Sequence, residues 1–166
     1  MNIFLPEETI YDSVRALDDR RIIKQILECK TILDVALDET KKGYAKHPVV
    51  VYYKDYPMFV ACYGVFACME YYHRFNKVHE LYPIIFIVYD SLKVQTFGIK
   101  YDDKIIEPFV ERFYCEGSKT DPNCIRTTEN TVELFRNKLC KKWDNDKYPP
   151  KWTNRQPPEW YHSNRE

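Results

Sequence analysis

The spacing of apolar residues predicts a chain built mainly from helices. Between residues 18 and 38, apolar side chains recur every three or four positions, as on one side of an amphipathic helix. This apolar stripe consists of Ile22, Ile26, Cys29, Leu33, Ala36 and Leu37. Asp18 or Asp19 can cap the start of the helix, because an acid suits the positive end of the helix dipole. The other side of the helix carries the charged residues Arg20, Arg21, Lys24 and Glu28.

The segment from Pro57 to about Asn76 is apolar on nearly every side, which is typical of a helix at the centre of a core. Its small residues recur at helical spacing and would let another helix approach closely. They are Ala61, Gly64 and Cys68. Before this segment, a short helix is expected from Pro6 to Leu17, and the stretch that starts at His47-Pro48 is interpreted as helical from its context.

The second half of the chain is less regular. Leu81 to Val94 fits either a strand or a helix, because a β-branched run is followed by helical spacing. Thr96 to Asp103 predicts a turn region, and an irregular stretch is expected from Phe109 to Asn123. Thr128 is expected to cap a last helix that ends near Trp143.

Composition supports an all-α fold. The chain has 166 residues, of which 45% are hydrophobic, so it can form one domain with a sizeable core. Only four glycines argue against an architecture rich in tight hairpins. We therefore predict a compact, single-domain helical bundle over residues 1–166, with an irregular, Pro- and Trp-rich tail over residues 143–166. The net charge is zero, so a DNA-binding surface would require segregation of charge.

Cysteine and histidine usage predicts no metal or cofactor. The six cysteines include no Cys-x-x-Cys pair, and the four histidines lack metal-ligand spacing. Cys115 and Cys124 flank a loop and could pair, but reduced thiols are the default expectation. Pro6-Glu7-Glu8 stands where a signal peptide needs an apolar run, and the longest apolar run is too short to span a bilayer. We expect an intracellular, reducing location without a membrane partner.

Glu28 is the first candidate for chemistry, because it is a single carboxylate among three cations. One interpretation is a solvated helix face with a Lys24–Glu28 pair, which contributes only a few tenths of a kcal/mol. The other is a carboxylate that is held among cations in a groove, where the cations bind an anionic polymer. On pattern alone the solvated face is the commoner case.

The end of the chain mixes aromatic and basic residues, namely Trp143, Lys147, Lys151, Trp152, Arg155, Trp160 and Tyr161. Such a mixture suits base stacking with phosphate contact. The alternative is a lid, in which the tryptophans lie against the helices, since Trp side chains are usually well buried. The two interpretations are compatible if only the cations face outward.

Two short motifs resemble those of a known family. The run from Asp19 to Glu28 resembles the first-helix motif of the pyrimidine-dimer DNA glycosylase (phage endonuclease V) superfamily, and Glu28 falls on the catalytic Glu of that motif without a gap. Tyr44 to Pro48 resembles the Tyr-x-x-His-Pro segment of the family. One difference is that Arg21 replaces the usual His.

The resemblance is closer to a branch of mostly uncharacterised viral and phage proteins. These proteins begin with Met-Asn-Ile-Phe, as this chain does. They also share a stretch like Tyr72 to His79 and a tail like Lys151 to Trp160. The resemblance covers most of the chain and is thin between Leu81 and Thr128.

The resemblance implies a mostly helical domain with its N-terminus in the core. In characterised members the terminal α-amine attacks C1′ of a damaged nucleotide, and the glutamate supports base loss, imine formation and strand scission. Glu28 would then be the catalytic carboxylate and the Met1 amine the nucleophile, since Asn2 is too large for efficient Met removal. An α-amine suits this role, because its usual pKa near 7.8 leaves far more free base than the 10.4 of a lysine.

The expected function is that of a DNA glycosylase with apurinic-site lyase activity on damaged or modified pyrimidines. The expected DNA or substrate contacts are Arg20, Arg21, Lys24, His47, His73, Arg74, Lys77, Lys141, Lys142, Lys151 and Arg155. Two alternatives stay open. One is a nucleic-acid-binding or virion-associated module without turnover. The other is an N-glycosidic enzyme for free nucleotides, which fits the neutral charge.

Overall fold

The computed structural model describes residues 1–38, 40, 41, 43–97 and 129–161, and within these residues it contains helices and no strand. The helices are α1 (Ile10–Ala16), α2 (Asp19–Leu37), α3 (Pro48–Tyr53), α4 (Pro57–Phe75), α5 (Tyr82–Phe97) and α7 (Glu129–Asn145). The prediction of an all-α fold is confirmed. The predicted irregular stretch, the Thr128 cap, Cys115 and Cys124 lie outside the described residues. None of the described helices combines the length and apolar character that a bilayer crossing needs.

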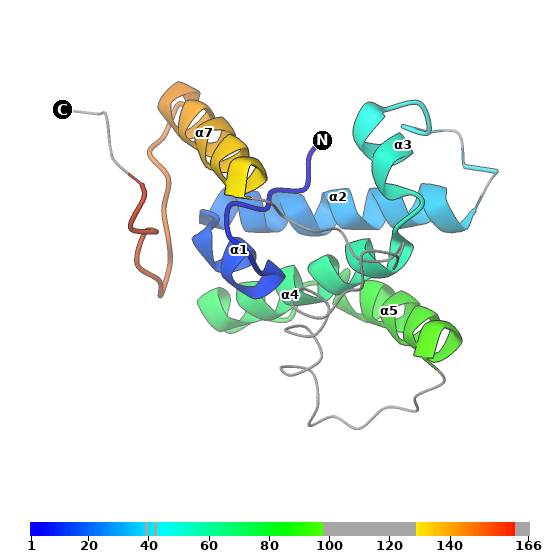
Figure 1. The fold of residues 1–166 in the computed structure, drawn as a ribbon. Coiled ribbons are helices and arrows are strands. Elements are labelled where there is room, and N and C mark those ends of the chain that lie inside the picture. The colour runs from blue at the N-terminus through cyan, green and yellow to red at the C-terminus, as the bar shows by residue number, and fades with distance from the viewer. Residues whose placement is uncertain (39, 42, 98–128, 162–166) are drawn as a thin grey trace.

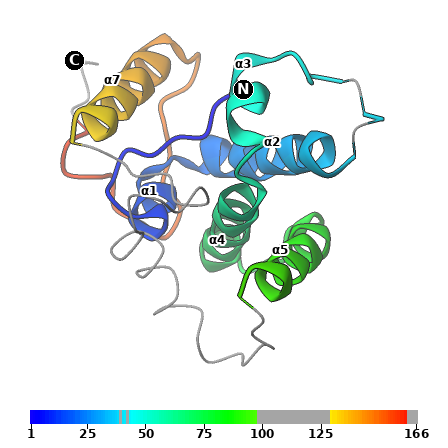
Figure 2. The same cartoon turned by 45° about the vertical axis from the view of Figure 1, so that its right-hand side comes forward.

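Helix α4 forms the centre of the core, as predicted. Every residue from Met58 to Cys68 is buried, because other elements surround this apolar helix. Helices α1, α2 and α5 all pack against it. Figure 1 shows α2 and α4 running side by side, and Figure 2 shows α5 beside α4, with α2 above both.

Gly64 is a point where two neighbouring helices pack closely against α4. A Cβ atom at this position would lie 2.9 Å from Cγ2 of Ile85 on α5 and 3.2 Å from Cβ of Cys29 on α2. Helices α2 and α5 therefore both pack against the predicted seam of small residues on α4. The segment that fitted either a strand or a helix is α5, whose Ile85 packs into this seam.

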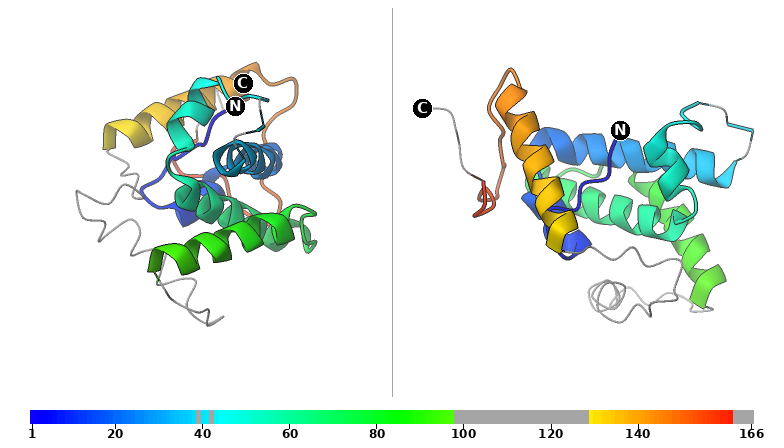
Figure 3. Two further views of the ribbon diagram at one scale, coloured as in Figure 1. Left: turned by 90° about the vertical axis from the view of Figure 1, so that its right-hand side faces the viewer. Right: turned by 45° about the horizontal axis from the view of Figure 1, so that its top comes forward.

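Helix α2 is buried on two sides. Its apolar stripe is buried as predicted at Ile22, Ile26, Cys29 and Leu33, whereas Leu37 near its end is half exposed. The charged side is also buried at Arg21 and Glu28, so the interpretation of a solvated face is wrong there. Figure 3 shows the reason, since the N-terminal segment and α7 lie on the side of α2 that faces away from α4.

Three boundaries differ from the sequence predictions. Helix α1 begins at Ile10 and not at Pro6, because Thr9 is its N-cap and accepts a hydrogen bond from the Asp12 N–H at 3.0 Å. Helix α5 runs through Phe97, where a turn was expected from Thr96. Helix α7 runs through Asn145, so the irregular tail starts after this residue and not at residue 143.

The tail closes over the junction of α1 and α2. Trp143, only 1% exposed, lies at the centre of a ring cluster with Trp152, Trp160 and Tyr161. The indole of Trp152 donates a hydrogen bond to the Ala16 carbonyl at 3.0 Å. Figure 1 shows the tail beside α7. These contacts favour the interpretation of the tail as a lid, because its aromatic rings are used in packing.

Candidate active site

The first five residues form an extended segment that lies across α2. Ile3, Phe4 and Leu5 are buried, and the Phe4 ring packs edge-on against Phe135 of α7. The backbone N–H of Phe4 donates to Oε1 of Gln25 at 2.9 Å, and its carbonyl accepts from the Tyr63 hydroxyl at 2.7 Å. Contacts from α2, α4 and α7 therefore fix the position of the N-terminus.

Glu28 contacts the first two residues of this segment. The Met1 amine nitrogen lies 3.7 Å from Oε1 of Glu28, and the backbone N–H of Asn2 donates to Oε2 at 2.9 Å. The amide of Gln25 donates to the same Oε2 at 2.8 Å. Lys24 Nζ lies 3.9 Å from Oε1, so the i,i+4 pair expected from the sequence is present. An amine, a carboxylate and a lysine are thus gathered in one place.

An arginine pair lies beside the carboxylate. Arg21 Nη1 lies 2.7 Å from Oδ2 of Asp146 and 3.2 Å from Oδ1 of Asp18, while Arg20 Nη2 lies 3.1 Å from Asp146. Burial opposes the charge of Arg21, but the hydrogen bond to Asp146 and the charges of both acids outweigh it and raise the pKa of Arg21. Arg21 therefore stays charged beside Glu28.

Asp18 lies at the start of α2 and connects this helix to α7 beside the site. It is the N-cap residue of α2, as predicted, but its carboxylate makes no capping hydrogen bond to the helix. The side chain instead accepts from the Trp143 indole at 2.9 Å and from Arg21. Asp18 therefore ties α7 to α2 next to the site.

These groups surround a cavity of about 300 Å³. Its lining consists of Met1, Asn2, Phe4, Arg20, Arg21, Lys24, Glu28, Lys142 and Asp146. Cationic groups outnumber the two acids in this lining, although the chain as a whole is neutral. The cavity has the size of a small ligand site and a positive surplus, as a pocket for part of a nucleic acid requires.

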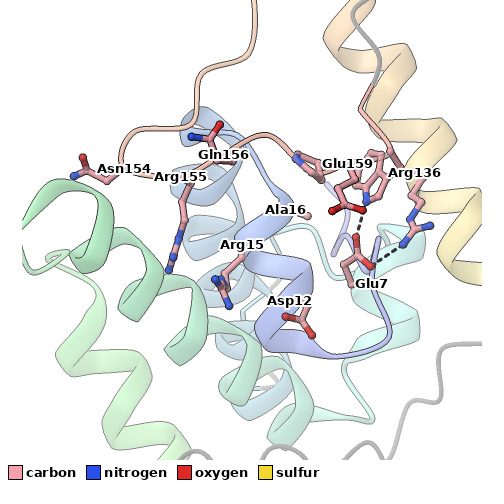
Figure 4. A pocket seen from close by; sticks show the side chains of 11 residues that line it. Glu7, Asp12, Arg15, Ala16, Arg136, Asn154, Arg155, Gln156 and Glu159 are labelled. Carbon is pink, nitrogen blue, oxygen red and sulfur yellow. Dashed lines mark hydrogen bonds and ion pairs between the residues drawn. The ribbon is translucent and has the colours of Figure 1, made fainter.

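A larger groove of about 1110 Å³ lies between α1 and the tail. Figure 4 shows it, with the Glu7–Arg136 ion pair at one edge and Arg15 of α1 below the tail. Arg136 is paired with Glu7, and Arg155 is paired with Glu70. The lining of this groove has three acids and three arginines, whereas cations outnumber acids around the smaller cavity, which is therefore the better candidate for an anionic substrate.

Two predicted contacts, Arg74 and Arg155, are used inside the fold. The Arg74 side chain is fully buried and donates to Glu70 at 2.7 Å and to Asp19 at 3.0 Å. Arg155 donates to both oxygens of Glu70 at 2.9 Å. The structure gives no support to Arg74 as a DNA contact, because its guanidinium has no access to solvent.

The remaining predicted contacts are spread over the surface. His47 caps α3, with its Nδ1 accepting from the Val49 N–H at 3.2 Å, and is partly exposed. The other four predicted contacts outside the cavity are exposed: His73, Lys77, Lys141 and Lys151. Their assignment as DNA contacts stays a prediction. Within the described part of the chain, no group of three or more His, Cys, Asp or Glu side chains is placed to hold a metal ion.

Sequence reasoning missed Gln25 and Asp146 as members of this site. Gln25 had a visible signal, because Arg21, Gln25 and Glu28 follow the i, i+4, i+7 spacing of one helix stripe. All three are buried. Asp146 had no such signal, since only the fold brings this tail residue to α2.

The comparisons with known proteins agree with the geometry at this site. The sequence model of the pyrimidine dimer DNA glycosylase family matches residues 1–83, which is half of the chain and includes Met1, Arg21, Gln25 and Glu28. Comparison with curated proteins and with solved structures gives no match. The family is one of DNA glycosylases, so membership implies a DNA substrate. On the extent of the match, the chain belongs to the pyrimidine dimer DNA glycosylase family.

Proposed function

We propose that this protein removes a damaged or modified pyrimidine from DNA and then cuts the strand at the resulting abasic site. The observation that carries the proposal is the 3.7 Å separation of the Met1 amine nitrogen and Glu28 Oε1. A primary amine and a carboxylate at this distance form a nucleophile and a proton acceptor that can work together.

The first step is attack of the neutral Met1 amine on C1′ of the damaged nucleotide. Glu28 Oε1 accepts the proton that the ammonium form must lose. The bond from C1′ to the base breaks as the bond from nitrogen to C1′ forms, and the base leaves with its electron pair and takes up the proton that Glu28 had accepted, which restores the carboxylate. The carboxylate also stabilises the positive charge that develops on the sugar.

The second step is strand scission from the imine. The nitrogen then loses one proton and O4′ gains one as the C1′–O4′ bond breaks, so that the sugar ring opens and a protonated imine forms between C1′ and the Met1 nitrogen, which acidifies the hydrogens on C2′. Glu28 is the nearest carboxylate to the Met1 amine and serves as the base that removes one of them. The 3′ phosphate then leaves by elimination, and the cations that line the cavity stabilise its charge.

The retained Met1 fits this scheme. Oε2 of Glu28 accepts from the Asn2 N–H, and Oε1 faces the Met1 amine, so one carboxylate engages two consecutive residues. The proposal therefore does not require removal of Met1.

The test is cyanoborohydride trapping on a duplex with one abasic site, after the intact mass of the protein has been measured. Reduction converts the imine into a stable adduct, which peptide mapping should locate at Met1. Glu28→Gln should still form the adduct but cut the strand about a hundredfold more slowly, as expected for loss of a general base. The exposed Glu80→Gln is the matched control and should behave as wild type. Absence of any adduct from a protein with a free Met1 amine would contradict the proposal.

A second candidate is N-glycosidic chemistry on free nucleotides. The zero net charge and the cavity of about 300 Å³ favour a single nucleotide over a long duplex. Release of free base from a nucleoside monophosphate, without binding to duplex DNA, would favour this candidate over the first.

A further inference from the structure

We infer that Gln25 is a positioning residue for the proposed reaction. It fixes the position of the N-terminal amine and determines which oxygen of Glu28 faces that amine. This inference rests on the proposed function. Gln25 lies one helical turn before Glu28 on the same side of α2 and is 1% exposed. Its side chain is thus enclosed between the helix and the N-terminal segment.

The carboxamide of Gln25 makes contacts with both of its ends. Its oxygen accepts from the Phe4 N–H at 2.9 Å, while its nitrogen donates to the Asn2 carbonyl at 2.7 Å and to Glu28 Oε2 at 2.8 Å. An amide nitrogen has two hydrogens, so both donors are used. No further rotation of the group is compatible with all three hydrogen bonds.

Through its contacts to Asn2 and Phe4, the Gln25 side chain makes the same pair of hydrogen bonds that a neighbouring β-strand would make. A neighbouring parallel strand would donate to the carbonyl of one residue and accept from the N–H two residues further on. Gln25 does both from a helix, and it thereby fixes the register of the segment along α2. A shift by one residue would exchange carbonyls for N–H groups and leave buried polar groups unpaired.

The third contact distinguishes the two oxygens of Glu28. Oε2 accepts from both Asn2 and Gln25, at 2.9 and 2.8 Å. Oε1 faces the Met1 amine at 3.7 Å and Lys24 at 3.9 Å. The hydrogen bond from Gln25 therefore turns Oε1 toward the amine, where proton transfer takes place in the proposed mechanism.

Only an amide can satisfy all three partners. In Gln25→Glu the shape is kept, but an introduced carboxylate would face the Asn2 carbonyl and Glu28 Oε2 without a proton to donate. Two adjacent carboxylates share a proton, which raises the pKa of the pair. At lower pH the shared proton would restore a donor toward Glu28. Gln25→Met keeps the length of the side chain but has no donor at any pH.

The experiment measures the rate of strand cutting at the abasic site of the duplex, which depends on Glu28, between about pH 5 and pH 8, a range that brackets the expected titration of the pair. We expect Gln25→Glu to react about 30-fold more slowly than wild type at pH 8, the size typical of a lost hydrogen bond to a charged group. Its rate relative to wild type should rise as the pH falls. Gln25→Met should remain slow at every pH.

A purely structural role would give a different result. It would leave the ratio of Gln25→Glu to wild type constant with pH in samples that circular dichroism shows to be folded, and this would overturn the inference. A wild-type rate for Gln25→Met would also overturn it. If Gln25→Met does not fold, the pH dependence of Gln25→Glu decides alone. A wild-type protein that forms no adduct would instead refute the proposed function, and the inference with it.

Discussion

Asp146 limits what the two arginines beside the site can bind. Its Oδ2 lies 2.7 Å from Arg21 Nη1 and 3.1 Å from Arg20 Nη2. Partial burial would raise the pKa of Asp146, but the hydrogen bond and charge of Arg21 outweigh it, so the pKa is lowered. Asp146 is therefore ionised near neutral pH. It lies between two guanidinium groups that, in the proposed function, would otherwise be open to a DNA phosphate.

Asp146→Asn should bind duplex DNA more tightly than the wild type. The substitution removes a competing negative charge, and a gain of about fivefold corresponds to the ~1 kcal/mol of a partly exposed ion pair. Fluorescence anisotropy with a labelled abasic duplex measures the affinity. Asp144→Asn makes the same charge change two residues earlier, at an exposed position at the end of α7 that does not line the cavity, and it should have a smaller effect. Unchanged or weaker binding by Asp146→Asn would count against this view of the residue.

At the scale of elements, α4 depends on the absence of a side chain at Gly64. Helices α2 and α5 approach it from two sides there, at distances that a Cβ atom would make too short. Ile85 is β-branched and has little freedom to turn away, because its χ1 angle is restricted. The close packing of three helices thus rests on one glycine.

Gly64→Ala should destabilise the protein. Overpacking costs about 1–3 kcal/mol, while the better helix propensity of Ala returns about 1 kcal/mol, so a net loss of about 1 kcal/mol is expected. Thermal melting followed by circular dichroism measures the change. Gly43→Ala is the matched control, because a Cβ at Gly43 would meet no atom within 4 Å. Equal melting temperatures for the two variants would show that the side chains around Gly64 move aside more easily than these distances indicate.

Element types followed from the apolar spacing more reliably than element ends or exposed faces. The apolar stripe at Ile22 and Ile26 placed α2 correctly, because burial dominates the choice of a helix face. The burial of Glu28 could not be predicted from helix periodicity, since it depends on a segment of five residues that covers the polar side. Likewise, α1 starts late because the Thr9 side chain competes with Pro6 as a helix start.

At the scale of the whole molecule, a buried charge network ties the tail to the helices. Glu70, whose side chain is nearly buried, accepts from Arg74 of its own helix and from Arg155 of the tail. Burial would raise the pKa of Glu70, but the hydrogen bonds from Arg155 and Arg74 outweigh it, so the pKa is lowered from its usual 4.5. The tail is thus held by a carboxylate that must stay charged.

Stability should therefore fall in acid. A carboxylate with a lowered pKa in the folded state contributes stability that is fully present above its ordinary pKa of 4.5. This contribution is lost as the pH falls below 4.5 and through the lower value of the folded state. Glu70→Gln should be about 2 kcal/mol less stable at pH 7, because it leaves Arg155 without its anion and the buried Arg74 with Asp19 alone.

Melting curves between about pH 3 and pH 7 check this prediction, because the range extends to both sides of the ordinary pKa of 4.5. The melting temperature of Glu70→Gln should depend less on pH than that of the wild type. Some dependence should remain, since the pKa of Asp146 is lowered as well. Parallel pH profiles for the two proteins would show that Glu70 does not carry the acid sensitivity.

The cavity joins two parts of the chain that differ in their relation to the family. Met1, Arg21 and Glu28 lie in the half that the family model matches, whereas Lys142 and Asp146 lie beyond it. The groups of the proposed reaction and part of the cavity wall therefore lie in different halves of the chain. Substitutions in α7 and the tail could alter which DNA is accepted while the amine and carboxylate stay in place. For protein engineering, α7 and the tail are therefore the places in which to change substrate choice without altering the groups of the proposed reaction.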